Sequence, residues 1–185
     1  MKFTFMGIFE NKIDRKSNNS SYHYSQIIIH WLVALLVIYQ FTFGGNIEFL
    51  ELESCINSKT NTLKSCQHLN NHYLVGVIIF LLMIVRLFLR ILFGAPPLPK
   101  SIPLTIKIFA RLSHYLIYLI LFSMPVFGIY MYYFNSDISQ FLHITFSKIL
   151  IFLILLHICA VAFHEGILGS KLFYRMASLS KKEDK

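Results

Sequence analysis

The sequence predicts an all-α membrane protein, built as a bundle of four transmembrane helices. Of its 185 residues, 56% are hydrophobic and only 14% are charged, whereas soluble domains carry about a quarter charged residues. The mean hydropathy is +0.60. Four apolar stretches are long enough to cross about 30 Å of hydrocarbon as helices of roughly 20 residues. This composition excludes an ordinary soluble domain.

The four stretches lie at 25–44, 71–93, 108–133 and 141–166. Turn-forming or helix-breaking residues separate them: Gly44-Gly45, Pro96-Pro97-Leu98-Pro99 and Asn135-Ser136-Asp137. Pro125 falls inside the third stretch, where neighbouring helices make a kink tolerable in a membrane. The sequence therefore predicts four separate spans.

Basic residues predict the orientation, because short loops rich in Lys and Arg stay in the cytoplasm. They cluster before the first stretch, around the second connection and after the fourth stretch. We therefore expect a cytoplasmic N-terminal segment (1–24), a four-helix domain (25–176) and a charged cytoplasmic tail (177–185). The first apolar run has no small-residue cleavage site after it, so we expect the first helix to be retained. The net charge of +8 is attributed to topology and not to nucleic-acid binding.

The connection between the first two stretches is expected on the outer face. It carries three glutamates, Glu48, Glu51 and Glu53, and two cysteines, Cys55 and Cys66. In an oxidising compartment the cysteines either form a disulfide or remain free thiols, and the sequence leaves both alternatives open.

Histidines inside the apolar stretches are the clearest indication of function. Of eight histidines, several lie at membrane depth, where a polar ring is costly and typically serves as a ligand or proton relay. His72 and His143 each lie near the start of a helix at the outer face. His30, His114 and His157 lie toward the cytoplasmic face.

The spacing on the fourth stretch predicts two stacked cofactors. His143 and His157 are fourteen residues apart, which is about 21 Å of rise and close to a whole number of turns. Two imidazoles from facing helices complete a six-coordinate haem iron, whereas zinc requires four ligands at one depth. We predict two b-type haems, the outer one held by His72 and His143. The inner haem is held by His157 and by either His30 or His114. Whichever of these two is not a ligand then lies beside the haem or at a quinone site.

Other polar residues are expected near these sites or at the membrane edge. Arg86 lies fourteen residues after His72, so it either neutralises the propionates of the inner haem or snorkels to the membrane surface. His68 is a fallback outer ligand. His23 and His164 are expected at the interface, His164 in contact with solvent.

Several short motifs resemble the bacterial cytochrome b-561 family over about residues 22 to 176. They are Ile29-His30-Trp31, His72 with Gly76, the run from Met83 to Arg90, the Pro96-Pro97 loop, the run from Ser113 to Tyr118, the run from Met124 to Gly128, and the His143/His157 spacing. The resemblance implies a di-haem, multi-pass cytochrome of the bacterial inner membrane that works with the quinone pool, with ubiquinone as its substrate. By position, it assigns His30 and His157 to the inner haem, and His72 and His143 to the outer haem.

Some members of that family oxidise superoxide at the periplasmic face and reduce ubiquinone, so the resemblance implies this oxidoreductase activity here, with superoxide or another periplasmic electron donor. The long first connection, Gly45 to Asn71, with its two cysteines and three glutamates, departs from the compact family pattern. Its acidic character opposes the attraction of an anionic substrate such as superoxide. Quinone reduction also needs protons, for which His114, Tyr115 and Lys148 are candidate donors. No catalytic residue is assigned.

Two alternatives remain. The chain is alternatively a cytochrome b subunit that anchors a larger respiratory hydrogenase or dehydrogenase, or a haem-free transporter or metal-binding protein that uses the histidines as a relay or as ligands. The visible absorption of the purified protein distinguishes the haem-free alternative from the two hypotheses that include haem.

Overall fold

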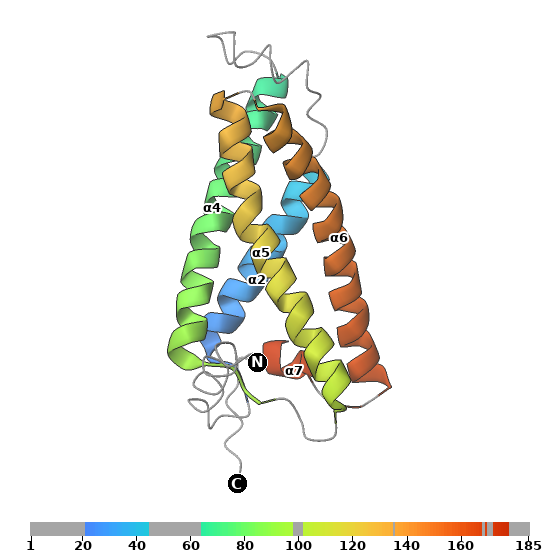
Figure 1. Cartoon of the computed structure of the whole chain (residues 1–185). Helices are drawn as coiled ribbons and strands as arrows, with labels where there is room; N and C mark the ends of the chain where they lie inside the picture. The colour runs from blue at the N-terminus through green and yellow to red at the C-terminus, as the bar shows by residue number, and fades with distance from the viewer. Residues whose placement is uncertain are drawn as a thin grey trace, which may run out of the picture.

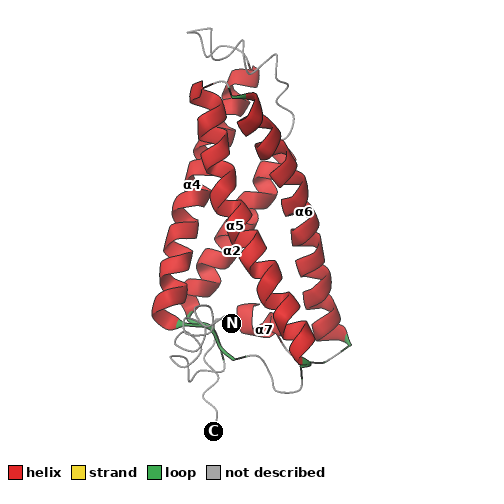
Figure 2. Ribbon diagram, viewed as in Figure 1, coloured by secondary structure: helices red, strands yellow, loops and turns green. Residues whose placement is uncertain are grey.

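The computed structural model describes residues 21–44, 64–97, 102–134, 136–167, 169 and 172–177. This part of the chain holds only helices (Figure 2), namely α2 (Tyr24–Phe43), α4 (Lys64–Phe93), α5 (Leu104–Phe134), α6 (Asp137–Gly166) and the short α7 (Leu172–Ala177). The first four are long and apolar enough to cross a membrane. The predicted all-α, four-span architecture is therefore confirmed.

The helices extend beyond the predicted apolar stretches at their N-terminal ends. α4 begins at Lys64, although its membrane-spanning part, Asn71–Phe93, coincides with the predicted stretch. α5 and α6 each begin four residues earlier than predicted. A hydropathy pattern marks only the part of a helix that contacts hydrocarbon, so polar first turns escape it.

Polar side chains cap two of the helices. His23 is the N-cap of α2, where its Nδ1 accepts from the Ser25 backbone N–H at 3.4 Å, and its ring stacks on Phe93 at 4.0 Å. Ser136 caps α6 by accepting from the Ser139 N–H at 3.3 Å. Each cap satisfies a backbone donor that the helix itself leaves unpaired. His23 therefore has a structural role at the end of its span.

The four long helices run alternately up and down, and α7 lies at the end where α2 begins (Figure 1). Two hydrogen bonds hold α7 there: Trp31 Nε1 donates to the Met176 carbonyl at 2.7 Å, and Arg175 donates to the Pro97 carbonyl at 2.9 Å. An even number of spans brings these segments to one end. That this end is cytoplasmic stays a prediction.

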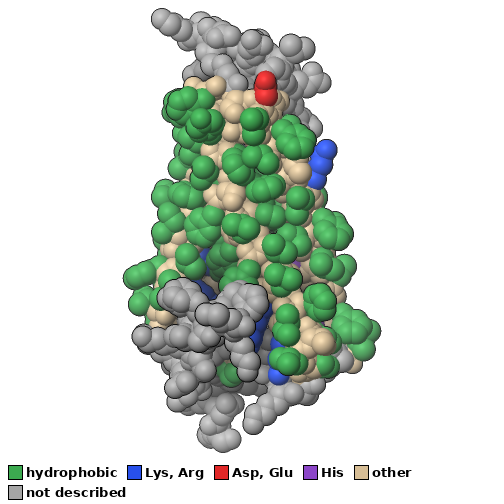
Figure 3. All heavy atoms as spheres, in the orientation of Figure 1, with side chains coloured by type: hydrophobic (Ala, Val, Ile, Leu, Met, Phe, Trp, Pro, Cys, Tyr) green, Lys and Arg blue, Asp and Glu red, His purple; other side chains and the backbone are tan. Residues whose placement is uncertain are grey.

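The buried core is thin and takes residues from all four long helices. Its members are Val33, Val37, Ile79, Met83, Ile120, Leu121, Leu150 and Leu153. Many large apolar side chains point outward instead, and they cover the visible face of the molecule (Figure 3). Water would penalise so large an apolar surface, whereas hydrocarbon requires it. The surface thus agrees with a membrane-embedded bundle.

Gln26 joins the beginning of α2 to the end of α4. It is buried, and its Nε2 donates to the carbonyls of Leu89 at 3.1 Å and Gly94 at 3.0 Å. Gly94 lies just beyond the end of α4, where no further turn supplies a donor for its carbonyl, whereas the Leu89 carbonyl accepts from Gln26 in addition to its partner within the helix. The amide therefore fixes the contact between two spans at this end of the bundle.

We expect Gln26→Leu to lower the free energy of unfolding by about 1 kcal/mol, because the buried carbonyl of Gly94 loses its donor. Thermal or denaturant unfolding of the detergent-purified protein measures this change. The control is Thr42→Val, since the exposed Thr42 hydroxyl donates only to carbonyls of its own helix. Equal stability of the two variants would contradict this role of Gln26.

Candidate functional site

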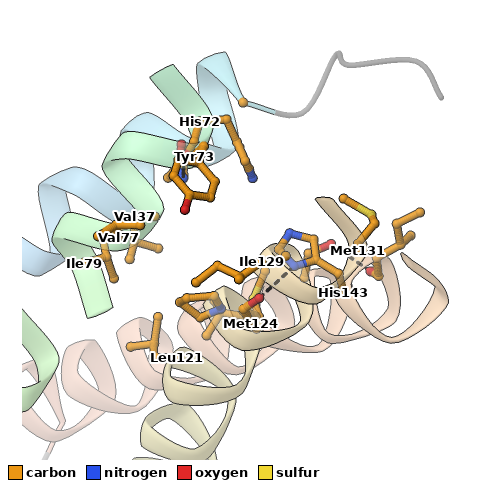
Figure 4. A pocket seen from close by; sticks show the side chains of 18 of the residues that line it. Val37, His72, Tyr73, Val77, Ile79, Leu121, Met124, Ile129, Met131 and His143 are labelled. Atoms are coloured by element: carbon orange, nitrogen blue, oxygen red, sulfur yellow. Dashed lines mark hydrogen bonds between the residues drawn. The ribbon is translucent and has the colours of Figure 1, made fainter. Parts of the chain in front are cut away.

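The structure brings His72 of α4 and His143 of α6 together at one end of the bundle. Their ring centroids are 5.9 Å apart and their planes cross at 67°. Both rings line one cavity between the helices, and Figure 4 shows them on opposite sides of it. The two rings therefore lie close together, as expected.

This cavity has a volume of about 490 Å³ and takes its walls from all four long helices. Most of its lining is apolar, as in typical cofactor pockets, which measure about 300–1,000 Å³. The polar exceptions among the lining side chains are Gln40, His72, Tyr73, Tyr132, Gln140, His143, Ser147 and Lys148. The chemistry suits a large, flat, mostly apolar cofactor held by a few polar contacts.

Two glycines, Gly44 and Gly128, allow the walls to approach the histidines closely, and a third, Gly76, lies beside Gln40. A Cβ atom on Gly44 would collide with Nδ1 of His72, and one on Gly128 would lie 3.3 Å from Cε1 of His143. A Cβ on Gly76 would lie 3.6 Å from Nε2 of Gln40. The space around the two rings therefore depends on Gly44 and Gly128, because a side chain at either position would crowd a histidine.

The nitrogen atoms of the two rings have different surroundings. Nδ1 of His143 donates to the Met124 carbonyl at 2.9 Å (Figure 4). Because a carbonyl only accepts, Nδ1 carries the proton and Nε2 is left unprotonated, as a metal ligand requires. Nδ1 of His72 is buried and has no hydrogen-bond partner among the residues that the structure describes.

A second polar group gathers toward the other end of the bundle, with one member from each long helix. It consists of His30 (α2), Arg86 (α4), His114 (α5) and His157 (α6). His30 lies close enough to the other three to interact with them electrostatically, and its ring meets Trp31 edge-on at 5.6 Å. The structure therefore places all the predicted inner residues in one neighbourhood.

His114 touches His157 directly. Their ring centroids are 5.0 Å apart in an edge-to-face contact, and Nδ1 of His114 donates to the Ala110 carbonyl of its own helix at 2.6 Å. With metal–nitrogen bonds of about 2 Å, two imidazoles on opposite sides of one metal would have centroids about 6 Å apart. The His72–His143 distance fits this value, but the His114–His157 distance is too short for it.

Arg86 packs against the neighbouring helix. Its side chain is half-buried between α4 and α5, its Nε donates to the Tyr118 hydroxyl at 2.8 Å, and its guanidinium lies 5.6 Å from the Tyr118 ring centroid. One terminal nitrogen is buried with no hydrogen-bond partner within the described residues. A buried guanidinium with an unused donor is suited to binding an anionic group.

Some functional candidates were missed or wrongly placed by sequence reasoning. Gln40 gave no signal. Tyr118 and Met124 fell within motifs of the family resemblance but were given no role, since their roles depend on contacts between helices. His164 was expected to contact solvent, but its side chain is buried, with 7% exposed. The side chains of His68, Cys55 and Cys66 lie outside the described residues.

Comparison with known proteins identifies the family and agrees with a membrane protein that holds its histidines in a helical bundle. The family profile described as "Prokaryotic cytochrome b561" matches residues 21–178. The chain is 27% identical over 182 residues to "Probable superoxide oxidase CybB" of Yersinia pestis, a match that covers 85% of this chain and 96% of that protein. It is 26% identical over 151 residues to "Cytochrome b562" of Cereibacter sphaeroides, with 82% and 91% covered.

The profile spans all four long helices and both histidine groups. Membership implies a b-type haem and electron transfer in the membrane. The chain belongs to the prokaryotic cytochrome b561 family and is a multi-pass electron-transfer protein of the bacterial inner membrane.

Proposed function

We propose that this protein carries electrons between the two faces of the membrane through two haems b. His72 and His143 bind the outer haem, and His30 and His157 bind the inner one. The observation that carries the proposal is the pair of facing imidazoles, 5.9 Å apart, across a largely apolar cavity. When bound, a haem supplies an iron that gains or loses one electron without needing a proton.

At the outer site, the protein holds the ligands between largely apolar walls. The carbonyl of Met124 fixes the tautomer and orientation of His143, and such outer contacts also tune the metal. Apolar walls lower the local dielectric and so affect the reduction potential. Two imidazole ligands leave no open position for oxygen, which suits an electron carrier.

At the inner site, Arg86 supplies a positive charge for a haem propionate. Its unpaired buried nitrogen would otherwise be costly, because a buried charge needs a partner. The short His114–His157 contact favours His30 as the second ligand and leaves His114 as a neighbour of the site. His114 and Tyr115 are both exposed on α5, so a quinone in the lipid could take protons from them.

We further propose that the electron donor is superoxide, as the name of the Yersinia relative suggests, and that the electron acceptor is ubiquinone. Two superoxide anions would each give one electron at the outer face, and one ubiquinone would take both electrons with two protons, which yields two O₂ and one ubiquinol. Lys148 supports this, because it is an exposed cation in the wall of the outer cavity, where it attracts an anion.

The first prediction concerns the haem ligands. We expect two low-spin haems per chain in the wild-type protein, the loss of one in His72→Ala or His143→Ala, and the loss of the other in His30→Ala or His157→Ala. Reduced-minus-oxidised spectra and haem assays of the purified variants measure this. His114→Ala is the matched control and should keep both haems.

Absence of haem from folded wild-type protein would overturn the proposal. If His114→Ala lost a haem while His30→Ala kept both, the inner ligand would be His114 and our assignment of His30 would be wrong.

The second prediction concerns Arg86. Arg86→Gln removes a cation, so we expect the potential of the inner haem to fall by about 60 mV, which is roughly tenfold in the ferrous-to-ferric ratio. Redox titration measures both haems. Arg90→Gln is the comparison, because it removes a cation one turn further along that also acts on His114 but lies at the Tyr22 ring, 6.0 Å from its centroid. We expect a smaller fall in that variant. An unchanged inner potential in Arg86→Gln would refute the propionate contact.

The third prediction concerns the substrates. Haem-loaded protein in lipid vesicles should reduce ubiquinone when superoxide is generated, with two superoxide anions consumed per ubiquinol. Lys148→Gln should slow this roughly tenfold at low salt and less at high salt, because screening weakens attraction. Haem reduction without quinone reduction would exclude ubiquinone as the acceptor, and lack of haem reduction would exclude superoxide as the donor.

A further inference from the structure

Gln40 of α2 lies against His72 at the outer cavity. Its Nε2 donates to the backbone carbonyl of His72 at 2.8 Å. Because that carbonyl only accepts, the amide nitrogen must face it, and this fixes where the other end of the amide lies. Oε1 of Gln40 is therefore the end of the amide that points away from the His72 carbonyl.

Two buried polar atoms remain without partners at this place. They are Oε1 of Gln40 and Nδ1 of His72, and neither has a hydrogen-bond partner among the described residues. One is an acceptor and the other is able to donate. Such atoms are rarely left unpaired in a protein interior, so the pair requires an explanation.

Gly44 shows that the two atoms are close neighbours. A Cβ built on Gly44 would collide with Nδ1 of His72 and would lie 3.2 Å from Oε1 of Gln40. Both atoms therefore border the same small space, which exists because residue 44 has no side chain. A small rotation of the amide, or one water molecule in this space, joins them.

We propose that Gln40 is a positioning residue for His72. Its Oε1 accepts the Nδ1–H of His72, so that Nε2 is unprotonated and faces the cavity. This is the role that the Met124 carbonyl has for His143 on the opposite side of the cavity. The inference rests on the proposed function, since it concerns the ligand of the outer haem.

The contact has a predictable effect on the haem. An acceptor at Nδ1–H makes the imidazole a stronger electron donor, which favours the oxidised iron and lowers the potential. Gln40 also holds the backbone of α4 through its Nε2. A test must therefore separate the acceptor from the packing.

Gln40→Leu and Gln40→Glu make this separation. Leu removes both the acceptor at Oε1 and the donor at Nε2, whereas Glu keeps an acceptor toward Nδ1 of His72. In redox titrations of the loaded protein, we expect Leu to raise the ferrous-to-ferric ratio of the outer haem roughly tenfold at a fixed potential. Glu should leave this ratio at or below that of the wild type, and the electron paramagnetic resonance signal of the outer haem should change with Leu only.

Gln26→Leu is the matched control, because Gln26 is another glutamine of α2 whose amide donates to carbonyls of α4 and the residue after it. It should leave the outer potential unchanged. If Gln40→Leu does not retain the outer haem, its retention in Gln40→Glu supports the inference.

Equal shifts in both Gln40 variants, no shift in either, or equal loss of haem from both would overturn the inference and leave the histidine assignments standing. Wild-type protein without haem would overturn the proposed function, and this inference with it.

Discussion

The cost of placing polar side chains in hydrocarbon governs this structure. Within the bilayer, an unpaired donor or acceptor finds no water. The described spans meet this constraint by turning their polar groups toward other helices: Gln26 and Gln40 of α2 bind carbonyls of α4 and the residue after it, Arg86 binds Tyr118, and His143 binds Met124. Between membrane helices such contacts, with close packing, determine which faces meet. The polar residues therefore specify the arrangement of the bundle as well as its chemistry.

The apolar core separates the two histidine groups. On each long helix, the core residues lie between the outer and inner polar positions, as Leu150 and Leu153 do between His143 and His157 on α6. A layer of apolar side chains opposes the passage of ions. An arrangement of this kind allows electrons to pass between two cofactors while protons stay on their own side.

The spans could be predicted from the sequence, and so could the gathering of the main histidines toward two ends of the bundle, because hydropathy and helical rise are properties of single helices. The partners of those histidines were less accessible. Whether His30 or His114 serves His157 depends on how α2 and α5 are rotated, and the sequence gives no measure of that rotation. Gly44 was interpreted only as the end of a helix, although its lack of a side chain also creates the space beside His72. Contacts between helices determine both which histidine faces His157 and what Gly44 does beside His72.

The separation of the two groups along α6 makes the proposed reaction electrogenic. His143 and His157 differ by fourteen residues, about 21 Å of rise, in a hydrocarbon layer of about 30 Å. An electron that passes from one site to the other thus crosses roughly two-thirds of the membrane voltage. A charge crossing the whole membrane gains or loses about 2.3 kcal/mol per 100 mV, so each such transfer is shifted by about 1.5 kcal/mol per 100 mV. With a negative interior, inward electron flow works against the field, and the two cofactors need potentials that differ enough to overcome it.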